Sequence, residues 1–262
     1  MKEMRRVWKN PGFWFAVLLG VFSMLYPHMD TYLFKHSPLE YFASGDFLYF
    51  MMMPLRYGLA KLFLPMIAVF PSAIFLAEDQ RQREHLLAYY RWGAWRYMRH
   101  RMGQAVFSAV LAAALGLLIY TAFAAVACPW HDNIVSSWRT LEGYPFQNWI
   151  NRYEGMPFLV LQLFCLCASA AVWALVGFSI ACFTANSGID IGGTFLAHYG
   201  VSWFLTRVLH ASEWSPMVLQ APSNRYVGSI GMIAVRLGVW LALALVLALG
   251  CAKCFLIRME ES

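Results

Sequence analysis

The sequence predicts an all-α membrane protein with six transmembrane helices, because its composition and its apolar segments both favour this fold class. Hydrophobic residues make up 60% of the 262 residues and charged residues only 13%, whereas about half of a soluble domain is apolar and about a quarter is charged. The excess of apolar side chains is therefore expected to face lipid. A helix of ~20 apolar residues crosses the ~30 Å hydrocarbon layer. Six segments meet this requirement: 12–27, 55–77, 103–127, 157–183, 190–210 and 229–252.

The segment ahead of the first span, residues 1–11, mixes apolar and basic residues. The apolar ones include Met4, Val7 and Trp8, and the basic ones are Lys2, Arg5, Arg6 and Lys9. This mixture is typical of a helix that lies in the membrane interface, with rings among the headgroups and cations toward anionic lipid. An unstructured basic flank that only orients the first span is the alternative.

Basic residues are concentrated on one side of the predicted membrane. They occur before the first span, in residues 78–102 after the second span, and after the sixth span at Lys253 and Arg258. The alternate loops, 28–54, 128–156 and 211–228, carry only Lys35, Arg139, Arg152 and Arg225. Short loops rich in Lys and Arg stay in the cytoplasm. We therefore expect both termini to be cytoplasmic and the protein to be a multi-pass protein of the cell membrane. Its positive residues are expected to face the lipid bilayer rather than to bind nucleic acid.

The cytoplasmic segment 78–102 is longer and more amphiphilic than a turn requires. It combines arginines with aromatic residues: Arg81, Arg83, Arg91, Arg96, Arg99 and Arg101 with Tyr89, Tyr90, Trp92, Trp95 and Tyr97. An orientation signal alone needs fewer charges, so we interpret this segment as a docking surface for a soluble partner. A plain orientation signal is the alternative.

Charged residues inside the predicted spans allow two interpretations. Arg207 and Arg236 lie toward the outer ends of the fifth and sixth spans, and an arginine at mid-membrane costs ~2.5–3.5 kcal/mol on insertion scales. Long side chains near a span end relieve this cost by reaching the headgroups. The functional interpretation is that Arg207 or Arg236 lines a polar path or pairs with Glu213. At the inner start of the fifth span, Asp190 is expected to be a helix N-cap after Asn186.

The sequence predicts no catalytic site, no metal site and no cofactor of its own. Ser187 and His198 lie eleven positions apart on one segment, which separates them by ~16 Å along a helix and prevents a hydrogen bond between them. Cys251 and Cys254 lack the second ligand pair that a structural zinc site needs. The phosphate-binding loop G-x-x-x-x-G-K-[ST] does not occur, so the chain is not expected to hydrolyse ATP.

The arrangement of these features resembles the permease subunit of type-2 ATP-binding-cassette (ABC) exporters. That family combines a basic interfacial N-terminus, six spans with both ends inside, and a cytoplasmic loop after the second span. The loop has an acidic residue, then a short helix with a Glu and a Leu-Leu pair, and then a basic approach to the third span. The corresponding residues here are Glu78-Asp79, Glu84-His85-Leu86-Leu87, and Arg91 to Arg101.

The resemblance covers the whole chain in topology but only this loop in sequence. Members often place a Gly before the paired leucines and a Pro with Ser or Thr after them. This chain has Arg81-Gln82-Arg83 before them and Arg91-Trp92-Gly93-Ala94 after them. The limits of the short helix therefore do not follow from the motif.

The resemblance implies one transmembrane permease domain over residues 1–262, with a cytoplasmic coupling helix that fits a groove of a separate ATPase subunit. The residues implied to contact the ATPase are Arg83, Glu84, His85, Leu86, Leu87, Tyr90 and Arg91. That ATPase would bind ATP and magnesium, and a second permease subunit, identical or related, would complete an exporter of amphipathic molecules such as peptides, antibiotics, drugs or lipid-like compounds. The alternatives are a channel and a non-catalytic membrane scaffold or immunity protein, neither of which needs an ATPase.

Overall fold

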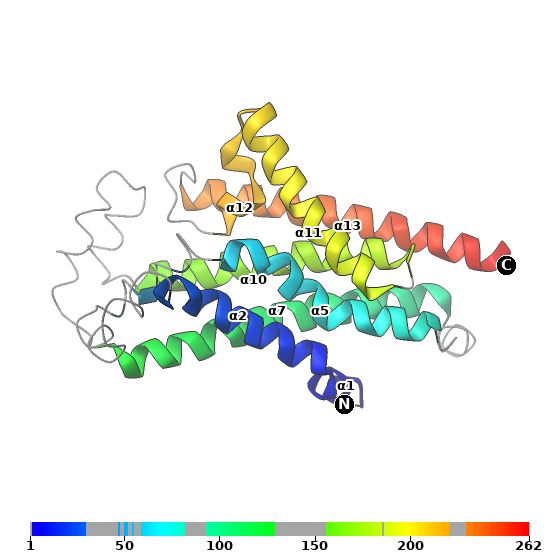
Figure 1. Ribbon diagram of the computed structural model, residues 1–262. Coiled ribbons are helices and arrows are strands. Elements are labelled where there is room, and N and C mark those ends of the chain that lie inside the picture. The colour runs from blue at the N-terminus through cyan, green and yellow to red at the C-terminus, as the bar shows by residue number, and fades with distance from the viewer. Residues whose placement is uncertain are drawn as a thin grey trace.

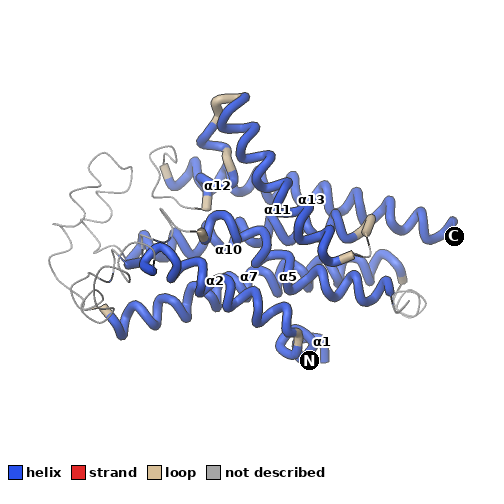
Figure 2. The backbone as a smooth tube through the Cα atoms, viewed as in Figure 1, coloured by secondary structure: helices blue, strands red, loops and turns tan. Residues whose placement is uncertain are grey.

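A computed structural model of the chain describes residues 2–29, 47, 50–51, 54, 59–81, 93–128, 156–184, 186–220 and 229–261. Within these residues every regular element is a helix (Figure 2). In chain order the elements are α1 (Lys2–Lys9), α2 (Pro11–His28), α5 (Ala60–Arg81), α7 (Ala94–Ala127), α10 (Met156–Ala181), α11 (Ser187–Trp203), the π-helix η3 (Phe204–Val208), the 3-10 helix η4 (Ser212–Trp214), α12 (Pro216–Leu219) and α13 (Ile230–Glu261).

Four of the described helices are long and apolar enough to cross a membrane. They are α2, α7, residues Val160–Ala181 of α10 and residues Ile230–Arg258 of α13. The all-helical part of the predicted fold class is confirmed for the described residues, and four helices have the length and composition of membrane spans. The second and fifth predicted spans correspond to α5 and α11, which are helical, and their crossing of the membrane stays a prediction.

The long helices run side by side in an elongated bundle (Figure 1). The end of α5, the start of α7 and the end of α13 lie together at one end, which we call the Asp79 end. The starts of α5, α10 and α13 lie toward the opposite end, which we call the distal end. Helix α1 and the C-terminus are both found toward the Asp79 end, and their cytoplasmic location stays a prediction.

Helix α10 occupies the middle of the bundle and contacts α5, α7, α11 and α13. Small side chains make this packing close, as is common between membrane helices. A Cβ added at Gly177 would overlap the side chain of Val69 on α5. A Cβ added at Gly116 on α7 would lie 3.4 Å from the Cα of Gly20 on α2. The backbones of α2 and α7 therefore approach each other directly, and Gly177 leaves room for a side chain of α5 against α10.

The corner between α1 and α2 is fixed by Asn10. Its side-chain oxygen accepts a hydrogen bond from the backbone N–H of Gly12 (2.9 Å), which caps α2. Its side-chain nitrogen donates to the carbonyl of Pro71 on α5 (3.3 Å). Trp14 donates across the corner to the carbonyl of Trp8 (2.8 Å). Residues 2–9 are thus helical, as the sequence predicts, and the position of this helix in a membrane interface stays a prediction.

The structure differs from the sequence analysis at the start of α11. The N-cap is Asn186, whose side chain accepts from the N–H of Gly188 (2.9 Å), so the prediction that Asp190 caps this helix is wrong. Asp190 instead lies in the first turn, fully buried, and accepts a hydrogen bond from Thr184. The asparagine takes the cap because it immediately precedes the helix, where its oxygen reaches the second helical N–H.

The segment between the second and third apolar helices is also shorter than 78–102. Residues 78–81 belong to α5 and residues 94–102 belong to α7, so only residues 82–93 lie between the two helices. Hydropathy ends a span where charged residues begin, but the backbone of a helix continues past the lipid into water. We call residues 82–92, which lie outside the described residues, the 82–92 segment.

Candidate functional site: a buried carboxylate beside the 82–92 segment

Asp79 is a fully buried acid near the end of α5, with 0% of its surface exposed. It lies two residues before α5 ends at Arg81. A buried carboxylate is strongly unfavourable unless cations and hydrogen-bond donors surround it. The partners of Asp79 therefore reveal which parts of the chain are held together here.

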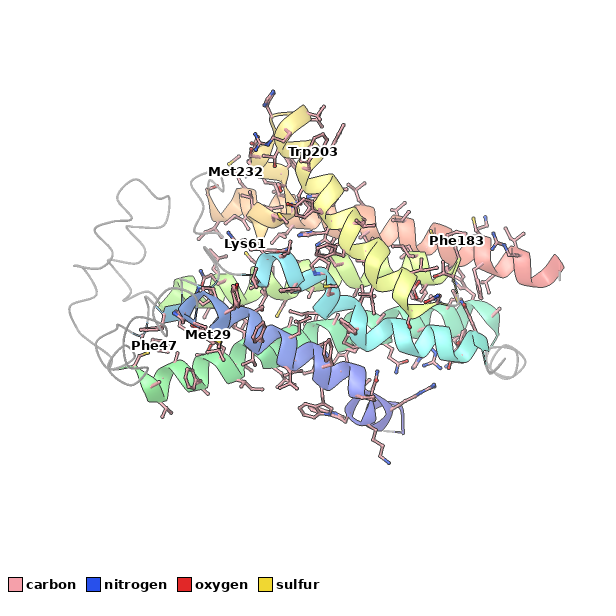
Figure 3. All side chains as sticks on the ribbon, in the orientation of Figure 1. Met29, Phe47, Lys61, Phe183, Trp203 and Met232 are labelled. Carbon is pink, nitrogen blue, oxygen red and sulfur yellow. The ribbon has the colours of Figure 1, made fainter. Side chains whose placement is uncertain are left out.

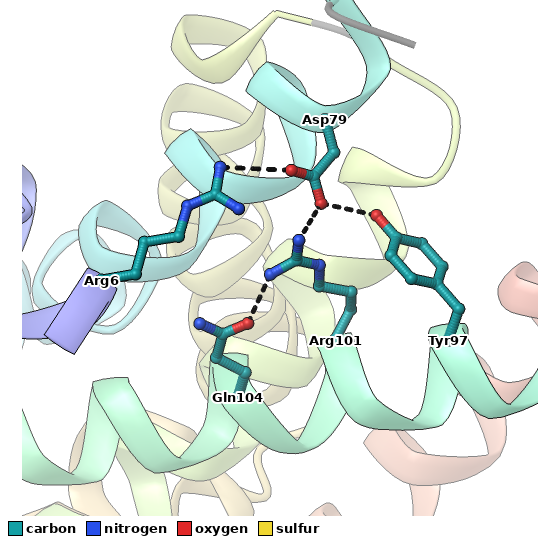
Figure 4. A network of polar contacts seen from close by, with 5 residues as sticks. All are labelled: Arg6, Asp79, Tyr97, Arg101 and Gln104. Carbon is teal, nitrogen blue, oxygen red and sulfur yellow. Dashed lines mark hydrogen bonds and ion pairs between the residues drawn. The ribbon is translucent and has the colours of Figure 1, made fainter. Parts of the chain in front are cut away.

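Both carboxylate oxygens of Asp79 have partners from other helices (Figure 4). The guanidinium of Arg6 on α1 donates to Oδ1 (3.2 Å). The guanidinium of Arg101 forms an ion pair with Oδ2, and the hydroxyl of Tyr97 donates to the same oxygen (2.6 Å). Tyr97 and Arg101 are four positions apart on α7, so they lie on one face of the helix. We call Arg6, Asp79, Tyr97 and Arg101 the Asp79 network.

Arg101 is itself held in place from two sides. Its Nη1 donates to the side-chain oxygen of Gln104 (2.6 Å), one turn further along α7. Its guanidinium carbon lies 5.3 Å from the centre of the Tyr97 ring, within the range of a cation–π contact. The side chain of Arg101 is 11% exposed and that of Arg6 is 34% exposed. The ion pair with Arg101 is therefore the more buried and the more sensitive to removal of one partner.

The network joins three elements that are far apart along the chain. Asp79 stands on the N-terminal side of the 82–92 segment, Tyr97 and Arg101 stand on its C-terminal side, and Arg6 belongs to α1. A second contact ties α5 to α10, because the side chain of Gln80 donates to the carbonyl of Ala181 (3.0 Å). A displacement of the 82–92 segment would consequently be passed to α1, α5, α7 and α10 together.

The Asp79 network holds α1, α5 and α7 together. Its carboxylate is paired, and its cations are engaged with it. Among the residues that the structure describes, no group of three histidine, cysteine or acidic side chains is arranged to hold a metal ion. The arrangement fixes helices relative to one another.

The sequence-predicted contact residues for an ATPase lie outside the described residues. They are Arg83, Glu84, His85, Leu86, Leu87, Tyr90 and Arg91. The Asp79 network flanks them on both sides, which the sequence analysis did not anticipate. A signal was present: Tyr97 and Arg101 have helical spacing, and Asp79 is an acid beside a strongly basic segment.

The two arginines of the predicted polar path occupy different environments. Arg207 lies in the π-helix η3 and is exposed. Arg236 on α13 is buried, with 6% of its surface exposed, and its guanidinium lies 5.6 Å from the centre of the Trp214 ring. The exposed Arg207 and the buried Arg236 thus differ in environment, and their part in a polar path stays a prediction.

A second buried hydrogen-bond cluster lies at the distal end of α7. The hydroxyl of Tyr120 donates to the carbonyl of Phe50 (2.6 Å). A ring nitrogen of His28 lies 2.8 Å from the same hydroxyl, so His28 shares this bond network. This cluster connects α2 and α7 to Phe50. Each end of α7 therefore has a buried tyrosine whose hydroxyl donates a hydrogen bond to another segment.

The described residues form an all-helical bundle with four helices long and apolar enough to cross a membrane, and the buried Asp79 network joins three of its helices at one end. No protein-family model, curated protein or solved structure matches the chain.

Proposed function

We propose that the chain is the membrane-spanning permease subunit of a type-2 ABC exporter in the cell membrane. In this proposal all six apolar segments cross the membrane, α5 and α11 included, and the Asp79 end faces the cytoplasm. The observation that carries the proposal is the Asp79 network, because it fixes both sides of the 82–92 segment to the bundle. A segment that receives force from a partner needs such an attachment.

The physical requirement is rigid transmission of movement. A loop that hangs freely from two helices would absorb a push from a partner subunit, whereas a loop whose two helices are locked together passes the push to the bundle. Asp79 and its partners on α7 provide this lock in a region where the pair is shielded from water. Arg6 extends the lock to α1, so the N-terminal helix would move with the loop.

The proposed cycle begins in a separate ATPase subunit that binds ATP and magnesium. Closure of two such subunits would press on Leu86, Leu87 and their neighbours in two permeases and rotate the bundles against each other. An amphipathic molecule, such as a peptide, an antibiotic, a drug or a lipid-like compound, would then leave toward the outside. Exposed cations and rings of α1, among them Lys9 and Trp8, would hold the helix at the inner headgroups while the bundles move.

A channel and a non-catalytic scaffold or immunity protein are the competing functions. Neither needs a locked attachment on both sides of a cytoplasmic segment, and neither needs a second subunit that consumes ATP. A well-packed apolar pair is often as stable as a buried ion pair of the same volume. A channel or a scaffold would therefore gain no stability from the buried ion pair between Asp79 and Arg101.

Co-purification tests the proposal. The full chain, tagged after its last residue and produced in its own host, is extracted in a mild detergent, and the bound proteins are identified by mass spectrometry. The proposal predicts a stoichiometric subunit with a phosphate-binding loop, and ATP hydrolysis by the complex that stops when the lysine of that loop is replaced. A purified chain that conducts ions or moves a substrate without any such subunit contradicts it.

A further inference from the structure

The chain does not run straight from α11 to α13. After Trp203, where α11 ends (labelled in Figure 3), it passes through the π-helix η3 and then returns through η4 and α12. His210 lies at the turn with a φ of 51°, in the left-handed region that is uncommon for a residue with a side chain. We call residues 204–219 the strap, which is the yellow-to-orange segment between α11 and α12 in Figure 1.

The returning end of the strap is anchored in the bundle. Pro216 and Leu219 of α12 are buried, and Leu219 belongs to the same apolar cluster as Ile233 and Leu237 on α13. Helix α12 contacts α10, α11 and α13. The earlier part of the strap differs, because neither η3 nor η4 contains a buried residue. The strap therefore bridges α11 and α13 with few buried contacts, which is typical of a segment that opens locally.

Trp214, the last residue of η4, makes two contacts with α13. Its backbone carbonyl accepts a hydrogen bond from Nε1 of Trp240 (2.9 Å). Its ring centre lies 5.6 Å from the guanidinium carbon of Arg236, within the range of a cation–π contact. Arg236 and Trp240 are four positions apart, so they lie on one face of α13. Both contacts therefore meet at a single residue of the strap.

Arg236 is an unusual residue for its position. It is buried, and it lies in a helix that is apolar and long enough to cross a membrane. A charged side chain inside such a helix is expensive and commonly marks a functional element. The ring of Trp214 stabilises the guanidinium when the strap lies against α13. That stabilisation is lost when the strap moves away, so the contact favours the closed position.

Trp240 connects this contact with the core of the bundle. Its side chain is partly buried and packs against two apolar clusters. One of them contains Leu219 and Leu237, and the other contains Tyr97 of the Asp79 network. The residue that donates the hydrogen bond to the strap is therefore in physical contact with both halves of the core.

We propose that the strap is a gate that holds α11 and α13 together, with Trp214 as its latch, and that it opens when the substrate leaves the bundle. Opening breaks the contacts of Trp214 with Arg236 and Trp240. The hinge is placed at residues 204–210, where the π-helix and the left-handed His210 interrupt regular α-helical geometry. The inference rests on the proposed export function for its biological meaning, whereas the opening itself needs only the strap and α13.

A cysteine next to the latch reports the opening. Ser215 follows Trp214 directly and is buried, so Ser215→Cys should react slowly with a water-soluble maleimide while the strap is closed. The experiment uses the purified full-length chain in detergent, with the native cysteines replaced by serine, and measures the rate of this reaction. Ser23→Cys on α2, which is also buried, reports any general loosening of the bundle.

Two substitutions each remove one contact of the latch. Trp240→Phe deletes the indole N–H and keeps an aromatic ring, and Trp214→Leu deletes the ring beside Arg236. Each is expected to raise the reaction rate of Ser215→Cys about two- to tenfold, the factor given by one net hydrogen bond or one cation–π contact, and to leave Ser23→Cys unchanged. Trp214→Phe keeps a ring beside the guanidinium and should react like the original chain.

Trp14→Phe is the matched control for Trp240→Phe. Its Nε1 also donates to a backbone carbonyl, that of Trp8 (2.8 Å), but at the corner between α1 and α2. It should leave the reaction of Ser215→Cys unchanged. The latch is overturned if Trp240→Phe and Trp214→Leu both leave the rate at Ser215→Cys unchanged, or if they raise the rate at Ser23→Cys equally.

A gate must also respond to the transport cycle. In the complex with its ATPase, ATP and magnesium should raise the reaction rate of Ser215→Cys, a response that a purely structural contact would not give. A complex that transports without any such response overturns the gate and leaves export standing. Faster reaction in the two latch variants of a chain that recruits no ATPase refutes export and leaves the latch standing.

Discussion

The hydroxyl of Tyr97 donates a hydrogen bond across 2.6 Å to the carboxylate of Asp79, and this bond joins the start of α7 to the end of α5. Arg101 pairs with the same carboxylate oxygen, and Arg6 pairs with the other. Asp79 precedes the 82–92 segment along the chain, and Tyr97 and Arg101 follow it. The carboxylate of Asp79 is buried and both of its oxygens are bonded, so this joint fixes the two helices that flank the segment and carries the functional proposal.

Removing the Tyr97 hydroxyl should loosen the joint without unfolding the bundle. Tyr97→Phe deletes a hydrogen bond to a charged group, which is worth ~1.5–3 kcal/mol. Hydrogen–deuterium exchange measured by mass spectrometry should then become faster in the last turn of α5 and the first turn of α7.

Tyr120→Phe is the matched control for this change. Tyr120 is also a buried tyrosine of α7, and its hydroxyl donates to the carbonyl of Phe50 at the distal end. Its replacement should lower stability by ~0.5–1.5 kcal/mol, the net value of a neutral hydrogen bond, and leave exchange at the Asp79 end unchanged. Equal exchange effects of both variants at the Asp79 end would show that Tyr97 has no local role.

The ion pair between Asp79 and Arg101 should be far more sensitive to loss of one partner than to loss of both. Asp79→Leu alone leaves the buried guanidinium of Arg101 without its carboxylate, which costs ~3–5 kcal/mol. Arg101→Met alone should cost less, because Asp79 keeps its ion pair with Arg6 and its hydrogen bond from Tyr97. The double variant removes both charges and should recover most of the loss caused by Asp79→Leu, because Arg6 is partly exposed and can turn to water. Unfolding of the two single variants and the double variant, measured in one detergent, gives the coupling energy. Additive losses would mean that the pair is not buried as a unit.

Close packing between α5 and α10 predicts opposite effects for two glycine substitutions. Gly177→Ala would force the Val69 side chain to move, and overpacking of this kind costs ~1–3 kcal/mol. Gly200→Ala places a methyl group in open space on α11 and should stabilise the helix by up to ~1 kcal/mol. Thermal unfolding distinguishes them. A Gly177→Ala protein as stable as the original chain would show that α5 and α10 do not approach this closely.

The predicted sidedness can be measured with single cysteines. In a background where the native cysteines are serine, Lys35→Cys is expected to react with a membrane-impermeant maleimide on intact cells, because it lies in a loop with few positive charges. Arg91→Cys is expected to react only after the cells are permeabilised. The reverse pattern would invert the topology and remove the basis for an ATPase partner.

The helices could be predicted from the sequence because their signal is local. Uninterrupted apolar segments set the positions of α2 and α10 to within a few residues, since a membrane helix must satisfy its own backbone and has few alternatives. The extensions of α7 and α13 beyond the apolar limits were not predicted, because hydropathy reports contact with lipid and not helical hydrogen bonding.

The joint depends on contacts between distant positions. Asp79 and Arg6 are 73 positions apart, and no local pattern shows that an arginine of the N-terminal helix reaches the end of α5. Conversely, Arg207 attracts notice in the sequence as a charge within a span, yet it lies exposed in the π-helix that follows α11.

The most direct measurement of the central claim is the amount of ATPase bound by a variant whose paired leucines carry charges. Leu86→Asp together with Leu87→Asp should insert into the membrane normally and reduce the co-purified ATPase, or the ATP-driven activity of the complex, at least ~10-fold, because ~1.4 kcal/mol of lost contact already gives that factor. Lys253→Asp is the control, because it changes a charge at an exposed position near the end of α13. It should leave the amount of bound ATPase and the ATP-driven activity unchanged. If the leucine variant keeps its full complement of ATPase and its full activity, force does not enter the bundle through residues 82–92, and the account is wrong.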